Sequence, residues 1–418
     1  MLLLSAGSGA SAKGLSATLE ELLKTHQQVL AADADLAAAK ERAEAAWSAW
    51  YPTLDVTASY GQEVQKKGAG VADTNMPPRE MDVSVSQQLW DFGATNAAIR
   101  RARLELDQAQ ANLRAARQSV TLAGLRTHLD ILRNTKILDF AQGSIANIKR
   151  QAELEDSRVQ RGSGLATDVL QAKTQLAGAE ATRIQALGAL KRARNRYKNV
   201  YDHFPEKPRK MRQPPLPLDL LTENVDQAIE IAFKENPRLT AARTAAAIAR
   251  EDITRTRADE FLPTLDATAS RTWQEDFAGT IGGKVETLFK VEMNYSLNLG
   301  LTGVNTLKAA KHTQSAAEQR YINTRDQVEE QVRSGWDDLE TARDSAQQLH
   351  NQANIAAEFL ELARRERQLG NRSLIDVLAG ETSLINSSSQ AASADIDVAV
   401  AVFSLLNAMG RLTPQVIK

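Results

Sequence analysis

The stretch YPTLDVTASYG, Tyr51–Gly61, occurs a second time in nearly the same form in this chain of 418 residues. Its second copy is LPTLDATASRTW, Leu262–Trp273. Apolar and polar residues alternate in both copies, which is typical of a β-strand with one apolar face and one wet face. The second copy follows the first after 211 residues, measured from Pro52 to Pro263. Such a recurrence indicates an internal duplication.

Two further anchors support the duplication. Gly93 ends the phrase VSQQLWDFG, and Gly303 ends the phrase YSLNLGLTG 210 residues later. The phrase GSGLATDVL begins at Gly162, and GNRSLIDVL begins at Gly370, a spacing of 208 residues. Because the order is kept and the spacing drifts little, the sequence predicts one structural unit written twice.

The duplication predicts the organisation of the whole chain. The segments are a signal-peptide remnant at 1–12, a first repeat at 13–203, a proline-rich connector at 204–221 and a second repeat at 222–412. Each repeat is predicted to contain a helical run, two strands, a very long helix, a glycine turn and a last helix. The helices are expected near 16–49, 94–160 and 166–200, and again near 222–259, 304–368 and 374–408. The strands are expected near 53–65, 80–92, 264–276 and 289–301.

The two non-repeated segments have distinct compositions. The start, MLLLSAGSGASAKG, contains Ala10-Ser11-Ala12, which resembles a signal-peptidase site. The connector holds five of the eleven prolines and a basic cluster at Lys207, Arg209, Lys210 and Arg212. Proline fixes φ and lacks a donor, so we expect an extended connector. A solvated linker is favoured over a binding patch.

The predicted strands fit a membrane better than a soluble hairpin lying on helices. About 10 to 12 alternating residues is the length that a tilted transmembrane strand needs. Aromatic residues cluster where strands meet helices, as in an interfacial girdle. They are Trp50, Tyr51, Trp90, Phe92 and Phe261. No run of 18 apolar residues occurs, so a membrane contact is expected through strands or a surface.

Four strands have a consequence for assembly. An open sheet edge cannot face lipid, because unpaired backbone groups there cost several kcal/mol each. The smallest common barrels have about eight strands. The chain is therefore expected to oligomerise, with eight strands in a dimer or twelve in a trimer.

The long helices carry a heptad pattern. Apolar residues recur at spacings of three and four, which predicts a coiled-coil seam rich in alanine. In the first long helix they are Ile99, Ala102, Leu106, Ala109, Leu113, Ala116, Val120 and Ala123. In the second they are Val328, Val332, Gly335, Leu339, Ala342, Ala346, Leu349, Ala353, Ala356 and Leu360. A helix of about 65 residues is about 100 Å long, which suits a stalk or a tunnel wall.

Composition excludes several classes of function. The net charge of −1 gives no general attraction to nucleic acid. The absence of cysteine excludes disulfides, thiolate metal sites and a lipidated cysteine. The five histidines are scattered without metal-ligand spacing, and no nucleotide or hydrolase motif occurs. We therefore expect a protein that is not an enzyme and that has no cofactor or resident metal.

Five features point in one direction: the duplicated half, the PTLD strand start, the QLWDFG strand end, the helix opening at Asn236-Pro237 and the twin DVL turns. With these features the chain resembles the TolC-type outer-membrane efflux channel family. The resemblance implies an α+β membrane protein: a homotrimer with a twelve-stranded β-barrel continued by a long α-helical barrel. It implies a passive exit duct in the Gram-negative outer membrane, with a large periplasmic portion, for type I protein secretion or efflux of drugs and other small molecules. Implied partners are outer-membrane lipid, a periplasmic adaptor, and an inner-membrane ABC or proton-driven pump.

The resemblance also implies a periplasmic tip. Asp168 and Arg372 fall where family members place a gating ion pair, and Asp376 falls where a ring of carboxylates favours cations. A second family acid is Ala379 here, so the filter is expected to differ. N-capping of the following helices is the alternative role for Asp168 and Asp376. Adaptor contact is implied for the two turns, at Gly162, Gly164, Leu165, Gly370 and Asn371.

Two other functions stay open from the residues alone. One is a periplasmic coiled-coil scaffold with soluble hairpins, for which the strand alternation would have no membrane role. The other is a free-standing porin without adaptors, for which the long helices would have no evident purpose.

Overall fold

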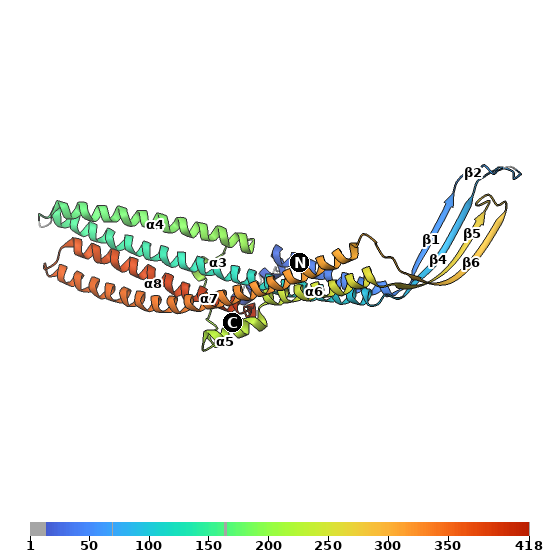
Figure 1. The fold of residues 1–418 in the computed structure, drawn as a ribbon. Helices are drawn as coiled ribbons and strands as arrows, with labels where there is room; N and C mark the ends of the chain where they lie inside the picture. Colours follow the sequence, from blue (N-terminus) through green and yellow to red (C-terminus); the bar gives the residue numbers. More distant parts are fainter. Residues whose placement is uncertain (1–13, 69, 163–164, 418) are drawn as a thin grey trace, which may run out of the picture. The chain divides into compact units, whose positions relative to one another are not determined.

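The computed structural model describes residues 14–68, 70–162 and 165–417, and Figure 1 traces their elements along the chain. The predicted signal remnant at 1–12 and the turn residue Gly164 lie outside the described residues. The helices are α1 (Leu15–Thr25), α2 (Gln27–Trp47), α3 (Ala94–Gln160), α4 (Ala166–Tyr201), α5 (Val225–Glu235), α6 (Pro237–Phe261), α7 (Thr302–Gln368) and α8 (Leu374–Ala408). Short 3-10 turns are η1 (Ser48–Trp50), η2 (Pro208–Lys210), η3 (Leu218–Leu220) and η4 (Pro414–Val416).

The four long hairpin helices lie where the sequence predicts them, within two residues at each end. The first helical run of each repeat is divided into two helices, and the predicted helix opening at Asn236-Pro237 is confirmed, because α6 begins at Pro237. Asn236 precedes Pro237, whose ring disfavours the helical conformation of the preceding residue. The Asn236 side chain then caps α6, because its Oδ1 accepts from the Arg238 amide at 2.9 Å. His26 breaks the first run in the same way, with an extended backbone between α1 and α2.

The chain forms two compact units, and each draws on both sequence repeats. Unit 1 comprises the described residues of Met1–Asp33, Asn112–Leu239 and Arg325–Lys418. Unit 2 comprises those of Ala34–Ala111 and Thr240–Thr324. Duplication therefore pairs equivalent segments side by side instead of giving one unit per repeat.

Unit 2 contains the predicted strands as one antiparallel sheet in the order β1-β4-β5-β6. Its strands are β1 (Thr53–Tyr60), β4 (Arg79–Trp90), β5 (Thr264–Glu275) and β6 (Gly283–Asn294), and a small hairpin is formed by β2 (Glu63–Gln65) and β3 (Thr74–Met76). The register joins predicted apolar positions across all four strands: Val85 pairs with Leu54 on one side and with Ala269 on the other, and Ala269 pairs with Phe289. Cross-strand partners share a face, so the predicted alternation is confirmed.

The fourth strand was predicted at 289–301, and this is wrong. β6 begins at Gly283, because a connection of only seven residues, 276–282, follows β5. The corresponding connection in the first repeat runs over 61–78 and contains β2 and β3. Residues after Asn294 have no partner on β5, because β5 itself begins at Thr264, directly after Pro263. Turn length therefore sets the register of this hairpin.

The core of unit 1 lies between the long helices. In the unit 1 part of the predicted seams, Leu113, Ala116 and Val120 of α3 and Val328, Val332 and Leu360 of α7 are buried, as expected. α8 is the most buried helix and is also long and apolar enough to cross a membrane, judged by length and composition only. Seventeen of its residues are buried, which explains its apolar composition by packing within the unit.

The N-terminal helix packs closely on α3. A Cβ at Gly124 would lie 2.7 Å from Leu19 and 2.9 Å from Leu22, both on α1, and 3.0 Å from the Tyr201 hydroxyl. Glycine at this position therefore allows the close approach of α1 and α4 to α3. The connector packs here as well: His128 lies 2.9 Å from the Arg212 carbonyl, and Pro205, Pro214 and Pro217 are buried. The connector is therefore solvated only in part, because three of its prolines are buried whereas Lys207, Arg209, Lys210 and Arg212 are exposed.

Candidate functional site

Unit 1 contains two long helical hairpins, and one turn joins the two helices of each. Gly162 and Gly370 follow α3 and α7 with φ values of +79° and +82°, a region that favours glycine. The Gly370 amide donates to the Arg367 carbonyl at 3.1 Å, and the Asn371 amide donates to the Glu366 carbonyl at 2.9 Å. This is the Schellman arrangement that satisfies the last carbonyls of a helix. The turn residues Gly162, Leu165, Gly370 and Asn371 are exposed.

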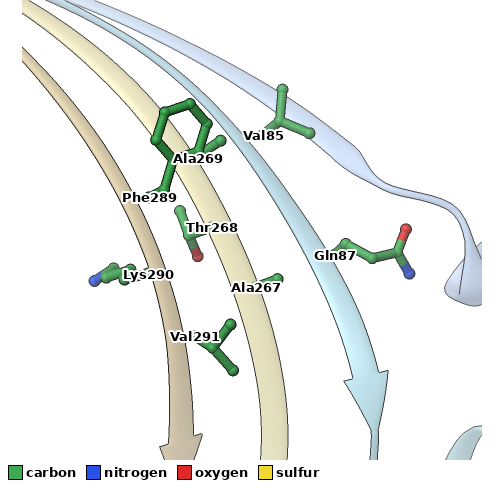
Figure 2. Close-up of a pocket in the computed structure, with 8 residues that line it drawn as sticks. All are labelled: Val85, Gln87, Ala267, Thr268, Ala269, Phe289, Lys290 and Val291. Carbon is green, nitrogen blue, oxygen red and sulfur yellow. The ribbon is translucent and has the colours of Figure 1, made fainter.

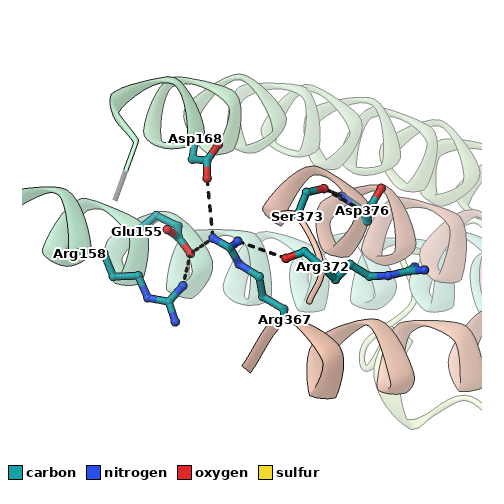
Figure 3. Close-up of polar contacts among 7 residues, drawn as sticks. All are labelled: Glu155, Arg158, Asp168, Arg367, Arg372, Ser373 and Asp376. Carbon is teal, nitrogen blue, oxygen red and sulfur yellow. Dashed lines mark hydrogen bonds and ion pairs between the residues drawn. The ribbon is translucent and has the colours of Figure 1, made fainter. Parts of the chain in front are cut away.

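Arg367, in the last turn of α7, connects the two hairpins. Its Nη2 lies 2.9 Å from Glu155 of α3 and 3.7 Å from Asp168 of α4. Its Nη1 donates to the Arg372 carbonyl at 3.2 Å. Figure 3 shows these contacts meeting at one guanidinium group, with Arg158 3.0 Å from the same Glu155 carboxylate. Only 2% of the Glu155 side chain is exposed, so this ion pair is largely shielded from water.

The predicted gating residues Asp168 and Arg372 do not pair within the described chain. Asp168 contacts Arg367 instead, and the Arg372 guanidinium lies 2.8 Å from Glu366. The Arg372 guanidinium also lies 5.3 Å from the centre of the Phe359 ring. Each predicted gating residue therefore has a partner of its own on α7.

Asp376 lies in the first turn of α8 but does not cap it. Ser373 is the N-cap, and its Oγ accepts from the Asp376 amide at 3.3 Å. The same Oγ donates to Asp376 Oδ2 at 2.8 Å. Asp168 likewise lies in the first turn of α4, whose N-cap position is held by Leu165. The capping alternative for both aspartates is therefore wrong, although a carboxylate in a first turn still stabilises the helix dipole.

A second buried acid lies further from the turns. Glu381 of α8 is 1% exposed and pairs with Arg364 of α7. Asn147 of α3 donates to the same carboxylate at 3.3 Å. A buried carboxylate is stable only when it is paired, so these contacts lock three helices together.

Sequence reasoning missed Glu155, Arg367 and Glu381. A signal was available for the two acids. Glu155 continues the spacing of the buried α3 residues Ile148 and Ala152, and Glu381 continues that of Leu374 and Leu378 on α8. An acidic residue on an apolar seam requires a cationic partner. Which cation provides the contact could not be read from the sequence.

The apolar face of the sheet in unit 2 is a second candidate site. Figure 2 shows a shallow hollow where small residues, Ala267 and Ala269, lie between Val85 of β4 and the larger Phe289 and Val291 of β6. The side chains of β1 and β6 are exposed along their whole length. Exposed apolar residues arranged on one face of a sheet are typical of a surface that meets an apolar environment.

Aromatic residues lie at the ends of these strands, as the sequence predicts. Tyr51, Trp90 and Phe92 are exposed, and Phe261 is half-buried. Trp90 and Phe92 pack edge to face, with ring centres 6.1 Å apart. A register shift between Gln88 and Trp90 pairs Trp90 with Leu265, which places the ring on the apolar face. Large rings at the end of an apolar band are typical of a membrane interface.

One duplicated chain thus contains an amphipathic four-stranded sheet with open edges and two helical hairpins, whose longer helices of 67 residues are about 100 Å long. These features define a class of protein: channels built from a membrane β-barrel and a helical tunnel. A sequence model of the outer membrane efflux protein family matches residues 18–200 and 228–411. The chain belongs to this family.

Individual relatives agree. The chain is 26% identical over 410 residues to the outer membrane efflux protein BepC of Brucella suis, covering 97% of this chain and 87% of BepC. It is 25% identical over 422 residues to the outer membrane protein TolC of Vibrio cholerae, covering 97% and 92%. The fold is similar to the crystal structure of the outer membrane protein VceC of Vibrio cholerae, with a TM-score of 0.81, 19% identity and coverage of 95% and 96%.

Membership confirms the predicted fold class, function and location. The protein is an outer-membrane channel of a Gram-negative bacterium, in a family of passive transport proteins that serve efflux and type I secretion. The members of this family are passive transport channels.

Proposed function

We propose that three copies of this chain close into one exit duct, with a twelve-stranded barrel in the outer membrane and a gated helical tip in the periplasm. The open sheet edges carry the proposal. β1 pairs only with β4, and β6 pairs only with β5, so both leave one row of backbone groups free among the described residues. Lipid cannot satisfy these groups, whereas β6 of one copy can satisfy β1 of the next.

The apolar sheet face then meets outer-membrane lipid. The hollow above Ala267 and Ala269 would be filled by acyl chains, and Tyr51, Trp90, Phe92 and Phe261 would lie at the interface. The opposite face carries Asp82, Glu80 and Lys290 and would line a wet pore.

At the tip, Arg367 supports a closed state. It ties α7 to α3 and α4 inside one copy through Glu155 and Asp168. Opening requires the two hairpins to move apart, which would break these contacts. Arg372 would exchange its contact with Glu366 for a pair with Asp168 of a neighbouring copy, and Asp168 would keep its contact with Arg367. Asp376, exposed at the start of α8, would form a ring of three carboxylates that favours cations.

The exposed turns would meet a periplasmic adaptor. Leu165 and Leu369 are apolar and exposed beside Gly162, Gly370 and Asn371, which suits contact with a partner protein. Gly164, which precedes Leu165 in the sequence, would contribute to the same contact. An inner-membrane ABC or proton-driven pump would supply the energy, and the docked pump would determine whether the cargo is a protein or a small molecule.

The test is single-channel conductance of the purified oligomer in planar bilayers. Arg367→Ala should raise the conductance, because the link between the hairpins is lost. Arg365→Ala is the matched control, since Arg365 is exposed and its ion pair among the described residues is with Glu361, one turn earlier in the same helix. Asp168→Ala and Arg372→Ala should raise the conductance as well, and Asp376→Asn should weaken cation selectivity. Equal conductance of Arg367→Ala and Arg365→Ala would refute the proposed role of Arg367 in holding the two hairpins together.

Assembly is tested separately by membrane fractionation and native electrophoresis. A heat-modifiable trimer in the outer membrane is expected. A monomer in the soluble fraction would overturn the duct and favour a periplasmic scaffold. Co-purification of an adaptor and pump, followed by a transport assay with each cargo class, separates secretion from efflux.

A further inference from the structure

α4 carries a second heptad seam, whose members are all exposed in the described part of the chain. Exposed residues recur every seven positions at Leu170, Ala177, Ile184, Lys191 and Lys198. Leu170 is 65% exposed and Ile184 is 60% exposed. Three of these residues lie two positions before a buried one: Leu170 before Ala172, Ile184 before Ala186, and Lys191 before Ala193. Two positions are about 200° around a helix, so this seam lies on the face opposite the packed one.

α7 carries a matching seam. Leu362, at 55% exposure, and Ile355, at 67%, are its apolar members near the turn. Further from the turn, Asp344 and Asp337 are exposed, each two positions before a buried residue, Ala346 or Leu339. The α7 seam is therefore also opposite the face that packs within the chain.

Except at the turns, where Arg367 of α7 contacts Asp168 of α4, the two helices lie at opposite sides of unit 1. α3 and α8 contact each other through Arg133 and Asp397, and α8 packs on α7 at Gly335. Figure 1 shows the same order, with α3 and α8 between α4 and α7. The two exposed seams therefore cannot cover each other within one copy, and a second copy is the partner that carries the complementary seam.

Residues of neighbouring copies can pair only where they lie at the same height along the axis of the ring, and this requirement fixes the register between α4 and α7. Arg367 of α7 lies 3.7 Å from Asp168 of α4, so the end of α7 and the start of α4 are level. A closed ring is generated by rotation alone, and rotation keeps every residue at its height. Lys191 and Lys198 come 25 and 32 residues after Ala166, and Asp344 and Asp337 come 24 and 31 residues before Gln368. At 1.5 Å per residue each lysine is within about 2 Å of its aspartate in height.

The charges also match. From Lys191 to Lys198, α4 has five basic residues and no acidic one. From Asp337 to Asp344, α7 has four acidic residues and one arginine. Within the described parts of the chain, neither Lys191 nor Asp337 nor Asp344 forms an ion pair. Lys198 lies 5.1 Å from the centre of the Phe204 ring.

We infer that α4 of one copy packs against α7 of the next through these seams, with Lys191 paired to Asp344 and Lys198 paired to Asp337. Leu170 and Leu362 would form the apolar end of the seam beside the turns. The inference rests on the proposed ring of copies and assigns its helical interface and register.

Cysteine cross-linking tests the register, because the chain has no cysteine of its own. Lys191→Cys combined with Asp344→Cys should give covalent dimers and trimers with a short bis-thiol reagent. The control combines Ala177→Cys with Asp344→Cys, which keeps the seam but separates the thiols by about 20 Å in height. Absence of cross-links in a conducting trimer, or equal cross-linking in the control, would overturn the register.

Charge reversal gives a second readout. Lys191→Asp should lower the temperature at which the trimer dissociates, and adding Asp344→Lys should restore it. A double variant no more stable than Lys191→Asp would also overturn the pairing. Failure of the unmodified chain to form any membrane oligomer would instead refute the proposed duct, so the two failures are distinct.

Discussion

α4 and α8 are the closing helices of the two repeats, yet only α8 is a core helix. Six residues of α4 are buried, against seventeen of α8, although the helices have 36 and 35 residues. The segment Lys191–Lys198 of α4 corresponds, at a spacing of 208, to 399–406 of α8, where Ala399, Phe403 and Leu405 are buried. One of the duplicated helices thus carries charged residues in this segment, whereas the other is mostly apolar over the equivalent segment.

The difference follows from position. α8 lies between α7 and α3, so most of its surface is covered within the chain. α4 is covered on one side only. In the proposed ring, α4 is an edge that must stay soluble before the copies assemble, and lysine and arginine provide this solubility.

The largest expected effect comes from the core of α8. Phe403→Ala should destabilise unit 1 by about 3–5 kcal/mol, because a fully buried ring is lost and a cavity remains. Thermal unfolding followed by circular dichroism measures the change. Asn195→Ala, at the equivalent exposed position of α4, should leave the melting temperature nearly unchanged. Similar losses for both variants would contradict the contrast between the helices.

A smaller effect is expected from the buried acid of α8. Arg364→Ala should cost about 2 kcal/mol, because Glu381 keeps only the 3.3 Å contact from Asn147. The partial exposure of Arg364 keeps the cost below that of a fully buried pair. The position equivalent to Glu381 on α4 is Lys173, which is exposed, so Lys173→Ala should change stability by less than about 0.5 kcal/mol. Denaturation midpoints of the two variants would decide this.

The smallest effect concerns the connector, which packs on α3 of the first repeat. Burial lowers the pKa of His128 below 6.5, partly offset by its hydrogen bond to the Arg212 carbonyl. The unfolded chain therefore binds a proton at His128 more readily than the folded chain does. The contribution of His128 to folding stability is present above about pH 6.5 and is lost as the pH falls towards the pKa of the folded state. His128→Gln should reduce the change in melting temperature between pH 7.5 and pH 5. His312→Gln, at an exposed position of α7, should keep the wild-type profile. An unchanged pH slope in His128→Gln would refute the assignment.

Much of the fold was predictable because it repeats locally. Alternation gave the faces of the strands, and spacings of three and four gave the buried seams of α3 and α7. The candidate site was predictable only in outline. The turns at Gly162 and Gly370 were identified, but Arg367 and Glu155 were not, because their contact joins residues 212 positions apart.

By itself the sequence determined the duplication, the order of helices and strands, the apolar face of the sheet and the heptad seams. These depend on periodicity within a few residues, which any single segment displays. Only the tertiary structure decided that β6 begins at Gly283, that Ser373 caps α8 in place of Asp376, and that Arg367 holds the two hairpins together. Register, capping and ion pairing depend on which atoms come within about 3 Å of one another, and distances across the fold are not encoded in local spacing.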